Sequence, residues 1–305
     1  MTTDKAKRII LADPRGFCAG VDRAILVVET ILKTSSTAHS EHGLPPVYVR
    51  KEIVHNKYVV HDLSQRGAKF VNSLDEVPDE AATYQIPVVF SAHGVSPHVQ
   101  EVAQQRGLYV IDATCPLVSK VHREVLRFVR DGYEIIYIGH RGHDEAVGVI
   151  GEAPDHVYLV DNVHDVEQLD FDPQVKLVLL TQTTLSIDET AAVSQALHTK
   201  FPWIEEPPSS DICYATQNRQ NAVKLVAQQS DCVVIVGSAN SSNSVRLVEV
   251  AQDELGNRGR AYRVDSADEL EDSWFENMNT VGISSGASVP DELVNGVVQY
   301  LQEKD

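Results

Sequence analysis

Apolar residues along the chain follow two alternating patterns. Short apolar runs of strand length are followed by longer stretches in which apolar residues recur every three or four positions, as Ala24, Val28 and Ile31 do. The short runs predict strands over residues 8–12, 47–50, 88–91, 109–112, 135–138, 177–181, 233–237 and 280–283. The longer stretches predict helices over residues 21–33, 96–106, 118–131, 187–200, 217–229, 242–255 and 290–303. This alternation indicates an α/β fold with mostly parallel sheets.

Three of the four cysteines recur at a regular interval. Cys18, Cys115 and Cys213 are separated by 97 and 98 residues, and each lies in a loop just before a predicted helix. Polar loops that follow predicted strands recur with a similar interval in two series. The first series comprises residues 54–56, 142–145 and 240–243, and the second comprises residues 91–94, 181–184 and 284–288. Each third of the chain therefore carries one cysteine loop and two polar loops.

These repeats predict three similar α/β lobes. We place them at residues 1–114, 115–212 and 213–305, each with one of the three cysteines. Ligands of parallel α/β sheets bind beyond the carboxyl ends of the strands, where such loops lie. We therefore expect a pseudo-threefold arrangement of the lobes, with the loops facing one centre. The alternative is that the spacing is accidental and that the thiols are buried as small apolar groups.

Composition restricts the class of partner. The chain has 305 residues, 26 Lys and Arg against 44 Asp and Glu, a formal charge of −18, and 43% apolar residues. An acidic surface repels nucleic acids and anionic membranes. No apolar run approaches the roughly 18 residues of a membrane span, no signal-peptide pattern opens the sequence, and the cysteines are too few for a secreted disulfide framework. We therefore expect a cytoplasmic protein that binds neither nucleic acid nor membrane, and an exposed loop over residues 33–46.

Several common site chemistries lack their sequence motifs. The chain has no closely spaced Cys or His pair of the structural-zinc type, no P-loop and no G-x-G-x-x-G. His143-Asp-Glu145 matches the H-x-E element of zinc deaminases, without its partner P-C-x-x-C. Residues 282–286 match a nucleophile elbow with Ser284 at the position of the nucleophile. The α/β-hydrolases place the catalytic histidine after this serine, but the last histidine of the chain is His198.

An iron–sulfur cluster fits the cysteines better. Cubane clusters take thiolate ligands that need not be adjacent in sequence, and three protein thiolates would leave one iron open to a substrate. The fourth cysteine, Cys232, begins an apolar run and is interpreted as a core residue.

The polar loops indicate an anionic ligand. Ser, Thr, Asn, Gln and neutral His side chains, together with helix N-termini, bind phosphate without a large cationic patch. Residues 183–186 and 240–244 each open a predicted helix. Plain N-capping is the alternative for any one loop and needs no ligand. Several converging loops would instead form a phosphate or diphosphate pocket.

Eight segments together resemble one known family. They include Pro14-Arg-Gly-Phe-Cys-Ala-Gly20 and Asp112-Ala-Thr-Cys-Pro116. The full set is residues 14–23, 53–56, 90–94, 112–116, 181–186, 211–216, 237–246 and 285–288. In this order, and over nearly the whole chain, they are similar to the 4-hydroxy-3-methylbut-2-enyl diphosphate reductases, also called LytB-type reductases.

The resemblance implies a reductive dehydroxylation, the last step of the methylerythritol phosphate route to isoprenoids. In this family a [4Fe–4S] cluster, held by three cysteines with one open iron, binds the allylic hydroxyl of the substrate. Two electrons and two protons remove that oxygen as water, which gives isopentenyl and dimethylallyl diphosphate. The resemblance also implies three α/β lobes around the cluster. Ferredoxin or flavodoxin is the expected electron donor, because the chain has no flavin or nicotinamide motif.

The resemblance further assigns individual residues. Cys18, Cys115 and Cys213 match the cluster ligands. Glu145 matches the acid that delivers protons, and Thr183 matches the residue beside the substrate hydroxyl. Residues that match the substrate pocket are His55, His93, His143, Thr183, Thr184, Asn240, Ser241, Ser242, Asn243 and Ser288. For Glu145 to carry a proton at neutral pH, burial or nearby negative charge must raise its pKa.

Two other functions stay open at this point. The protein could hold a cluster only as a redox or oxygen sensor, with the polar loops serving as helix caps. It could also be a zinc-dependent hydrolase that uses His143 and Glu145. Bound iron and sulfide would exclude the hydrolase, and turnover of the diphosphate would exclude the sensor.

Overall fold

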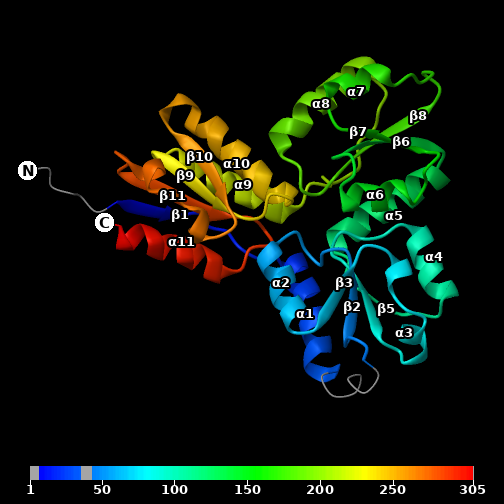
Figure 1. Cartoon of the computed structure of the whole chain (residues 1–305). Helices are drawn as coiled ribbons and strands as arrows, with labels where there is room; N and C mark the ends of the chain where they lie inside the picture. Colours follow the sequence, from blue (N-terminus) through cyan, green and yellow to red (C-terminus); the bar gives the residue numbers. More distant parts are fainter. Residues whose placement is uncertain (1–6, 36–42, 305) are drawn as a thin grey trace, which may run out of the picture. The chain divides into compact units, whose positions relative to one another are not determined.

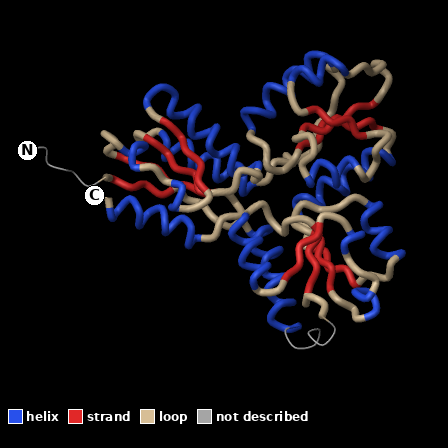
Figure 2. The backbone as a smooth tube through the Cα atoms, in the orientation of Figure 1, coloured by secondary structure: helices blue, strands red, loops and turns tan. Residues whose placement is uncertain are grey.

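The computed structural model describes residues 7–35 and 43–304. It is an α/β structure with three sheets whose strand pairs are all parallel (Figures 1 and 2). The predicted fold class is confirmed. Among the described helices, none has the length and apolar character needed to span a membrane.

The chain divides into two compact units. The terminal unit consists of the described part of residues 1–19 together with residues 55–59 and 214–304. The central unit consists of the described parts of residues 20–54 and 60–213. The short segment 55–59 is therefore an excursion of the chain from the central unit into the terminal one.

The central unit contains two sheets, of which the first has the order β3-β2-β4-β5. Its strands are β2 (Val47–Arg50), β3 (Ala68–Val71), β4 (Pro87–Phe90) and β5 (Tyr109–Asp112). The helices along this stretch are α1 (Ala19–Ser35), α2 (Lys57–Gln65), the 3₁₀ turn η2 (Leu74–Glu76), α3 (Glu80–Thr83) and α4 (Pro97–Gln105). Every residue of β4 is buried, as expected for an inner strand of a parallel sheet that is covered on both faces.

The second sheet of the central unit has the order β7-β6-β8. Its strands are β6 (Tyr133–Ile138), β7 (Val157–Val160) and β8 (Lys176–Thr181). Its helices are α5 (Pro116–Arg130), α6 (Asp144–Ile150), α7 (Val163–Gln168) and α8 (Ile187–Lys200). After α8 the chain returns along the open side of β8, where Glu205 forms a parallel bridge with Val178.

The sheet of the terminal unit has the order β1-β11-β9-β10. Its strands are β1 (Arg8–Leu11), β9 (Cys232–Val236), β10 (Arg260–Val264) and β11 (Thr280–Ser285). Its helices are α9 (Tyr214–Ala227), α10 (Ser242–Leu255) and α11 (Asp291–Glu303), with 3₁₀ turns η3 (Gly256–Arg258), η4 (Ala267–Glu269) and η5 (Asp272–Phe275). Cys232 is fully buried in β9, and burial raises the pKa of its thiol to about 12. The predicted core position of Cys232 is confirmed.

The three sheets share one strand order. In the first sheet, for example, β2 comes first in the sequence and lies between β3 and β4, and β5 lies on the other side of β4. The corresponding central strands are β6 in the second sheet and β9 in the third, and each of these sheets also has a fourth segment beside its third strand. That fourth segment is β5 in the first sheet, the chain at Glu205 in the second, and β1 in the third. Each fourth segment leads to a cysteine, and the interval of 97 and 98 residues is the length of this structural repeat. The lobe boundaries at residues 114 and 212 stay a prediction.

The structure adds elements that the hydrophobic pattern did not predict. These are the edge strands β3, β7 and β10 and the short helices α2, α3, α6 and α7. Helix α1 continues to Ser35, so the first residues of the predicted loop 33–46 are helical instead. Residues 36–42 of that loop lie outside the described residues.

Candidate active site

The three recurring cysteines are presented in one way. Each is half-buried and stands directly before a helix: Cys18 before α1, Cys115 before α5, and Cys213 before α9. Thiolate sulfur is the ligand that iron–sulfur clusters take from proteins, so the donor set fits such a cluster.

Each cysteine loop is tied to one polar loop of the second series by a backbone hydrogen bond. The N–H of Cys18 donates to the carbonyl of Ala287 at 3.1 Å. The N–H of Cys115 donates to Ala92 at 3.0 Å, and the N–H of Cys213 donates to Thr183 at 2.9 Å. The strand-end loops that carry Ser288, His93 and Thr183 therefore hold the three cysteines in equivalent ways.

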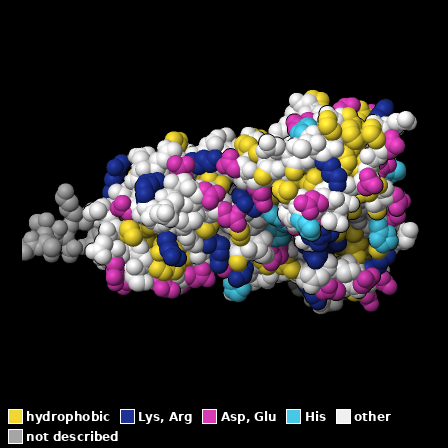
Figure 3. Space-filling model, turned by 90° about the horizontal axis from the view of Figure 1, so that it is seen from above, with side chains coloured by type: hydrophobic (Ala, Val, Ile, Leu, Met, Phe, Trp, Pro, Cys, Tyr) yellow, Lys and Arg dark blue, Asp and Glu magenta, His cyan; other side chains and the backbone are white. Residues whose placement is uncertain are grey.

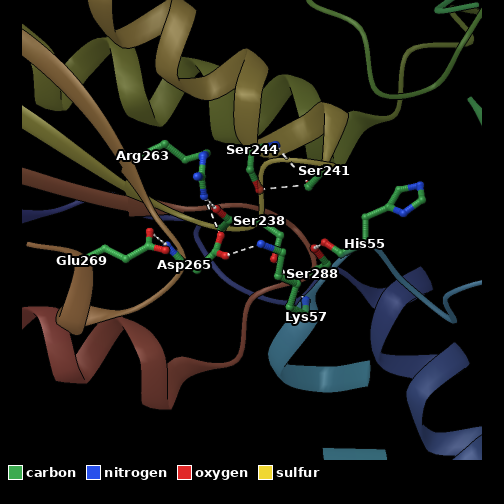
Figure 4. A network of polar contacts seen from close by, with 10 residues as sticks. His55, Lys57, Ser238, Ser241, Ser244, Arg263, Asp265, Glu269 and Ser288 are labelled. Carbon is green, nitrogen blue, oxygen red and sulfur yellow. Dashed lines mark hydrogen bonds and ion pairs between the residues drawn. The ribbon is translucent and has the colours of Figure 1, made fainter. Parts of the chain in front are cut away.

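The polar residues of the terminal unit gather at the N-terminus of α10. Ser241 caps this helix, because its Oγ accepts the N–H of Ser244 at 3.3 Å and the hydroxyl of Ser244 at 3.0 Å (Figure 4). A Cβ added to Gly237 or Gly286 would overlap the Ser244 hydroxyl. Glycine at both positions lets two strand-end loops approach the first turn of α10.

Asn243 is buried at the N-terminus of α10, and the oxygen and nitrogen of its side-chain amide differ in their hydrogen bonding. Its side-chain Oδ1 accepts the N–H of Ala287 at 2.9 Å, and only 5% of the residue is exposed. Among the described residues, the Nδ2 of Asn243 has no hydrogen-bond partner. A buried donor without an acceptor costs free energy, so this amide indicates an acceptor that arrives with a ligand.

His55 is attached to the same loops. The hydroxyl of Ser288 donates to the backbone carbonyl of His55 at 2.9 Å, which fixes the histidine beside the end of β11 (Figure 4). Asn240 and Ser242 lie on either side of Ser241 at the start of α10. The terminal unit thus brings together Cys18, His55, Asn240, Ser241, Ser242, Asn243 and Ser288.

Glu145 lies in the central unit, in the first turn of α6, and its carboxyl group is enclosed. Only 1% of the residue is exposed. Its Oε1 accepts the backbone N–H of Thr183 at 2.8 Å, and its Oε2 accepts the hydroxyl of the same threonine at 3.0 Å. Since the carbonyl of Thr183 also accepts the N–H of Cys213, a single residue joins the carboxyl group to a cysteine loop.

Burial sets the protonation of this carboxyl group. Removal from water raises the pKa of Glu145 to about 7, and the negative charge of Asp211 acts in the same direction. The two hydrogen bonds from Thr183 and the nearby His122 oppose the rise. Glu145 therefore holds a proton in a substantial fraction of molecules at neutral pH, as the predicted role of a proton donor requires.

Two further predicted residues lie close to Glu145. His143 caps α6, and its Nδ1 accepts the N–H of Glu145 at 3.2 Å. The ring of His93 stands edge-on to that of His143, with the ring centroids 5.8 Å apart. Thr184 Oγ1 accepts the side-chain amide of Gln182 at 2.9 Å. The central unit thus brings together His93, Cys115, His143, Glu145, Thr183, Thr184 and Cys213.

A buried ionic group that the sequence analysis did not identify supports the Cys213 loop. The Nζ of Lys120 lies 2.8 Å from Oδ1 of Asp211 and 3.3 Å from Oε2 of Glu124. The other Asp211 oxygen accepts the N–H of Thr181 at 3.1 Å. Burial and Asp211 raise the pKa of Glu124 to about 7, against the effect of Lys120. The only sequence signal was that Asp211 lies within one of the resembling segments.

The amino-acid sequence of this chain is similar to those of known proteins. A protein-family model described as "LytB protein" matches residues 9–302. A relative from Bifidobacterium longum, named 4-hydroxy-3-methylbut-2-enyl diphosphate reductase, is 71% identical over 97% of this chain and 85% of its own. A relative of the same name from Mycolicibacterium paratuberculosis is 55% identical over 97% of this chain and 85% of its own.

Solved structures agree with the sequence comparison. The E-1-hydroxy-2-methyl-but-2-enyl-4-diphosphate reductase of Plasmodium falciparum superposes with a TM-score of 0.89 at 40% identity, over 97% of this chain and 88% of that one. A second structure, of (E)-4-hydroxy-3-methyl-but-2-enyl diphosphate reductase, the terminal enzyme of the non-mevalonate pathway, has a TM-score of 0.66 at 30% identity. It covers 97% of this chain and 99% of that one. By the extent of these matches, the chain belongs to the LytB protein family.

Proposed function

We propose that this chain reduces 4-hydroxy-3-methylbut-2-enyl diphosphate to isopentenyl and dimethylallyl diphosphate. The names of its relatives support the reaction, and one observation of the structure supports its chemistry most directly. That observation is the enclosed carboxyl group of Glu145, which burial keeps partly protonated beside Thr183. A proton donor in this state is what the loss of a hydroxyl group as water requires.

Cys18, Cys115 and Cys213 would hold a [4Fe–4S] cluster with one open iron. Their equal presentation before α1, α5 and α9 supports this assignment. When bound, such a cluster supplies the electrons of the reduction and Lewis acidity at its open iron. The electrons come from a small cytoplasmic carrier, ferredoxin or flavodoxin.

The diphosphate would be bound mainly by neutral donors. Ser241, Ser242, Asn243 and Ser288 supply hydroxyl and amide groups, and the N-terminus of α10 supplies its partial positive charge. The buried Nδ2 of Asn243 supports this role because the diphosphate would provide its missing acceptor. His55 and His93 would add imidazole donors, with His143, Thr184 and Asn240 as further lining residues.

The step that we assign to this chain's own residues is the delivery of one proton to the departing oxygen atom. The carbon–oxygen bond of the allylic alcohol breaks, two electrons enter the allyl group, one proton forms the new C–H bond, and one proton completes the departing water. Glu145 would donate the proton to the departing oxygen. The hydroxyl of Thr183 would orient both the Glu145 carboxyl group and the substrate hydroxyl. Addition of the other proton at either end of the allyl group gives the two products.

Anaerobic purification of the chain tests this proposal. We expect about four iron ions and four sulfides per chain, and formation of both diphosphate products when an artificial low-potential reductant is added. A chain that carries the cluster without turning over the substrate would be a sensor. A chain that carries zinc in place of iron and sulfide would be the hydrolase considered above.

A further inference from the structure

Two hydrogen bonds hold the backbone of residues 55–59, the segment that carries His55. The carbonyl of His55 accepts the hydroxyl of Ser288 at 2.9 Å. The N–H of Lys57 donates to Oγ of the buried Ser238 at 3.1 Å. Both serines belong to strand-end loops that we assign to the diphosphate pocket, so the position of His55 depends on those loops.

One carboxylate connects this segment to the turn after β9. Asp265, directly after β10, has one oxygen 3.0 Å from the Nζ of Lys57 and the other 2.5 Å from Nη1 of Arg263. The same Arg263 nitrogen donates to the carbonyl of Gly237 at 2.7 Å, where the loop toward Ser241 begins. Figure 4 shows Asp265 between the lysine and the arginine.

Asp265 is itself held in place. Its backbone N–H donates to Oε2 of Glu269 at 2.7 Å. Its side chain is 21% exposed and that of Arg263 is 26% exposed, so both charges are largely shielded from solvent, whereas Lys57 is 66% exposed. The contact between Asp265 and Arg263 is therefore the firmer of the two.

We propose that Asp265 is a positioning residue for the diphosphate, and this inference rests on the function proposed above. Through Lys57 it holds the His55 segment, and through Arg263 it holds the Gly237 turn, in the arrangement that binds the anion. Asp265 acts through these two cations, because a carboxylate would repel the diphosphate. It lies outside all eight segments that resemble the reductases.

Neutralisation of charge is the competing role for this carboxylate, and it predicts the opposite result. If Asp265 only neutralised Lys57 and Arg263, Asp265→Asn would release positive charge close to the pocket and strengthen anion binding. If Asp265 positions the loops, the same substitution weakens anion binding. The sign of the change therefore distinguishes the two roles.

The experiment compares Asp265→Asn with the unsubstituted full chain, both loaded with cluster. We expect the affinity for inorganic diphosphate, measured by calorimetry and by competitive inhibition, to fall about tenfold or more. The KM for the substrate should rise by a similar factor with a much smaller change in kcat, because Glu145 and Thr183 lie in the other unit. Lys57→Met keeps the backbone N–H and should give a smaller loss, and Asp265→Glu should restore part of the affinity.

Asp272→Asn is the matched control. Asp272 accepts from Lys304 at 2.7 Å and from the hydroxyl of Tyr300 at 2.6 Å, in the same unit but away from the diphosphate loops. The Asp272→Asn variant should have the same affinity for inorganic diphosphate as the unsubstituted chain. Unchanged or stronger binding by Asp265→Asn, or an equal loss in the control, overturns the inference. Failure of the unsubstituted chain to bind diphosphate overturns the proposed function instead.

Discussion

A carboxyl group that has lost its contact with water keeps its proton to a higher pH than one in solution, and Glu145 is such a group. Among the residues that the structure describes, Thr183 alone donates hydrogen bonds to its two oxygens, through both its N–H and its hydroxyl. Because this arrangement leaves the carboxyl group partly protonated and held by two hydrogen bonds, removal of the acidic proton should affect the rate of the reaction far more than the binding of the substrate.

Glu145→Gln tests this expectation. Glutamine keeps the shape of the side chain but has no carboxylic proton, so turnover should fall by ~10²–10⁴-fold, the range for loss of a general acid. Iron content and substrate affinity should stay close to those of the parent. The rate should be measured on fully cluster-loaded protein with excess reductant. Turnover within a few-fold of the parent would exclude Glu145 from the mechanism.

The dependence of turnover on pH follows from the same group. Glu145 has a pKa of about 7, so the protonated fraction falls as the pH rises through 7. Turnover limited by this proton should therefore decline on the alkaline side of neutrality. The residual activity of Glu145→Gln should lack that decline, since it has no such group to titrate. A parent profile that stays flat from pH 6 to pH 8.5, about one and a half units to the alkaline side of this pKa, would argue against proton donation by Glu145.

The sequence could not show the state of Glu145. The residues around it, from His140 to Glu145, read as a polar loop, and Asp144 next to it suggests a solvated position. In the structure its carboxyl group is buried and bound by the loop after β8, where Thr183 is 38 residues away in sequence. The role came from the resemblance, and the physical basis for the role came from the structure.

Some elements of secondary structure could be predicted from the sequence and others could not. The inner strands β4 and β9 are entirely buried and were predicted from continuous apolar runs. The edge strand β10, with the sequence RAYRV, has charged residues and gave no such signal. Strand β10 pairs with β9 alone, and its charged side chains leave no apolar run for a hydrophobic pattern to detect. The long amphipathic helices were predicted to within a few residues because each buries one continuous stripe.

The cysteine-bearing elements give a prediction at this scale. Replacement of Cys18, Cys115 or Cys213 by serine should abolish or greatly reduce the iron content of anaerobically purified protein. Cys232→Ser should retain the iron, since this residue lies inside β9, although a hydroxyl buried there should lower the melting temperature. Equal loss of iron from Cys232→Ser in folded protein would contradict the assignment of three ligands.

At the scale of the whole molecule, the candidate residues form two groups with different chemical character. The terminal unit contributes neutral donors around the N-terminus of α10, and the central unit contributes the acid and its orienting threonine. We infer a division of roles in which substitutions of the serine and asparagine side chains at α10 mainly raise KM, and substitutions around Glu145 mainly lower kcat.

The free alcohol that lacks the diphosphate tests the anchoring role of the terminal unit. Charge-assisted hydrogen bonds contribute roughly 1.5–3 kcal/mol each, so the loss of several should weaken binding by orders of magnitude. Competition of the alcohol against the substrate measures this difference. Binding of the alcohol as tight as that of the diphosphate would show that the serine and asparagine side chains are only helix caps.

The pairing of β1 with β11 also fixes an order of events during synthesis. Strand β1 precedes the other described strands in the sequence, but its neighbour in the sheet begins at Thr280, so the two can pair only after residues 280–283 have been synthesised. The loop of Cys18 depends on the same part of the chain, because the backbone N–H of Cys18 donates to the carbonyl of Ala287. The sheets of the central unit can form earlier from residues that emerge together. If Cys18, Cys115 and Cys213 hold a cluster as proposed, the loop of Cys18 can present its thiol in this arrangement only after Ala287 has been synthesised.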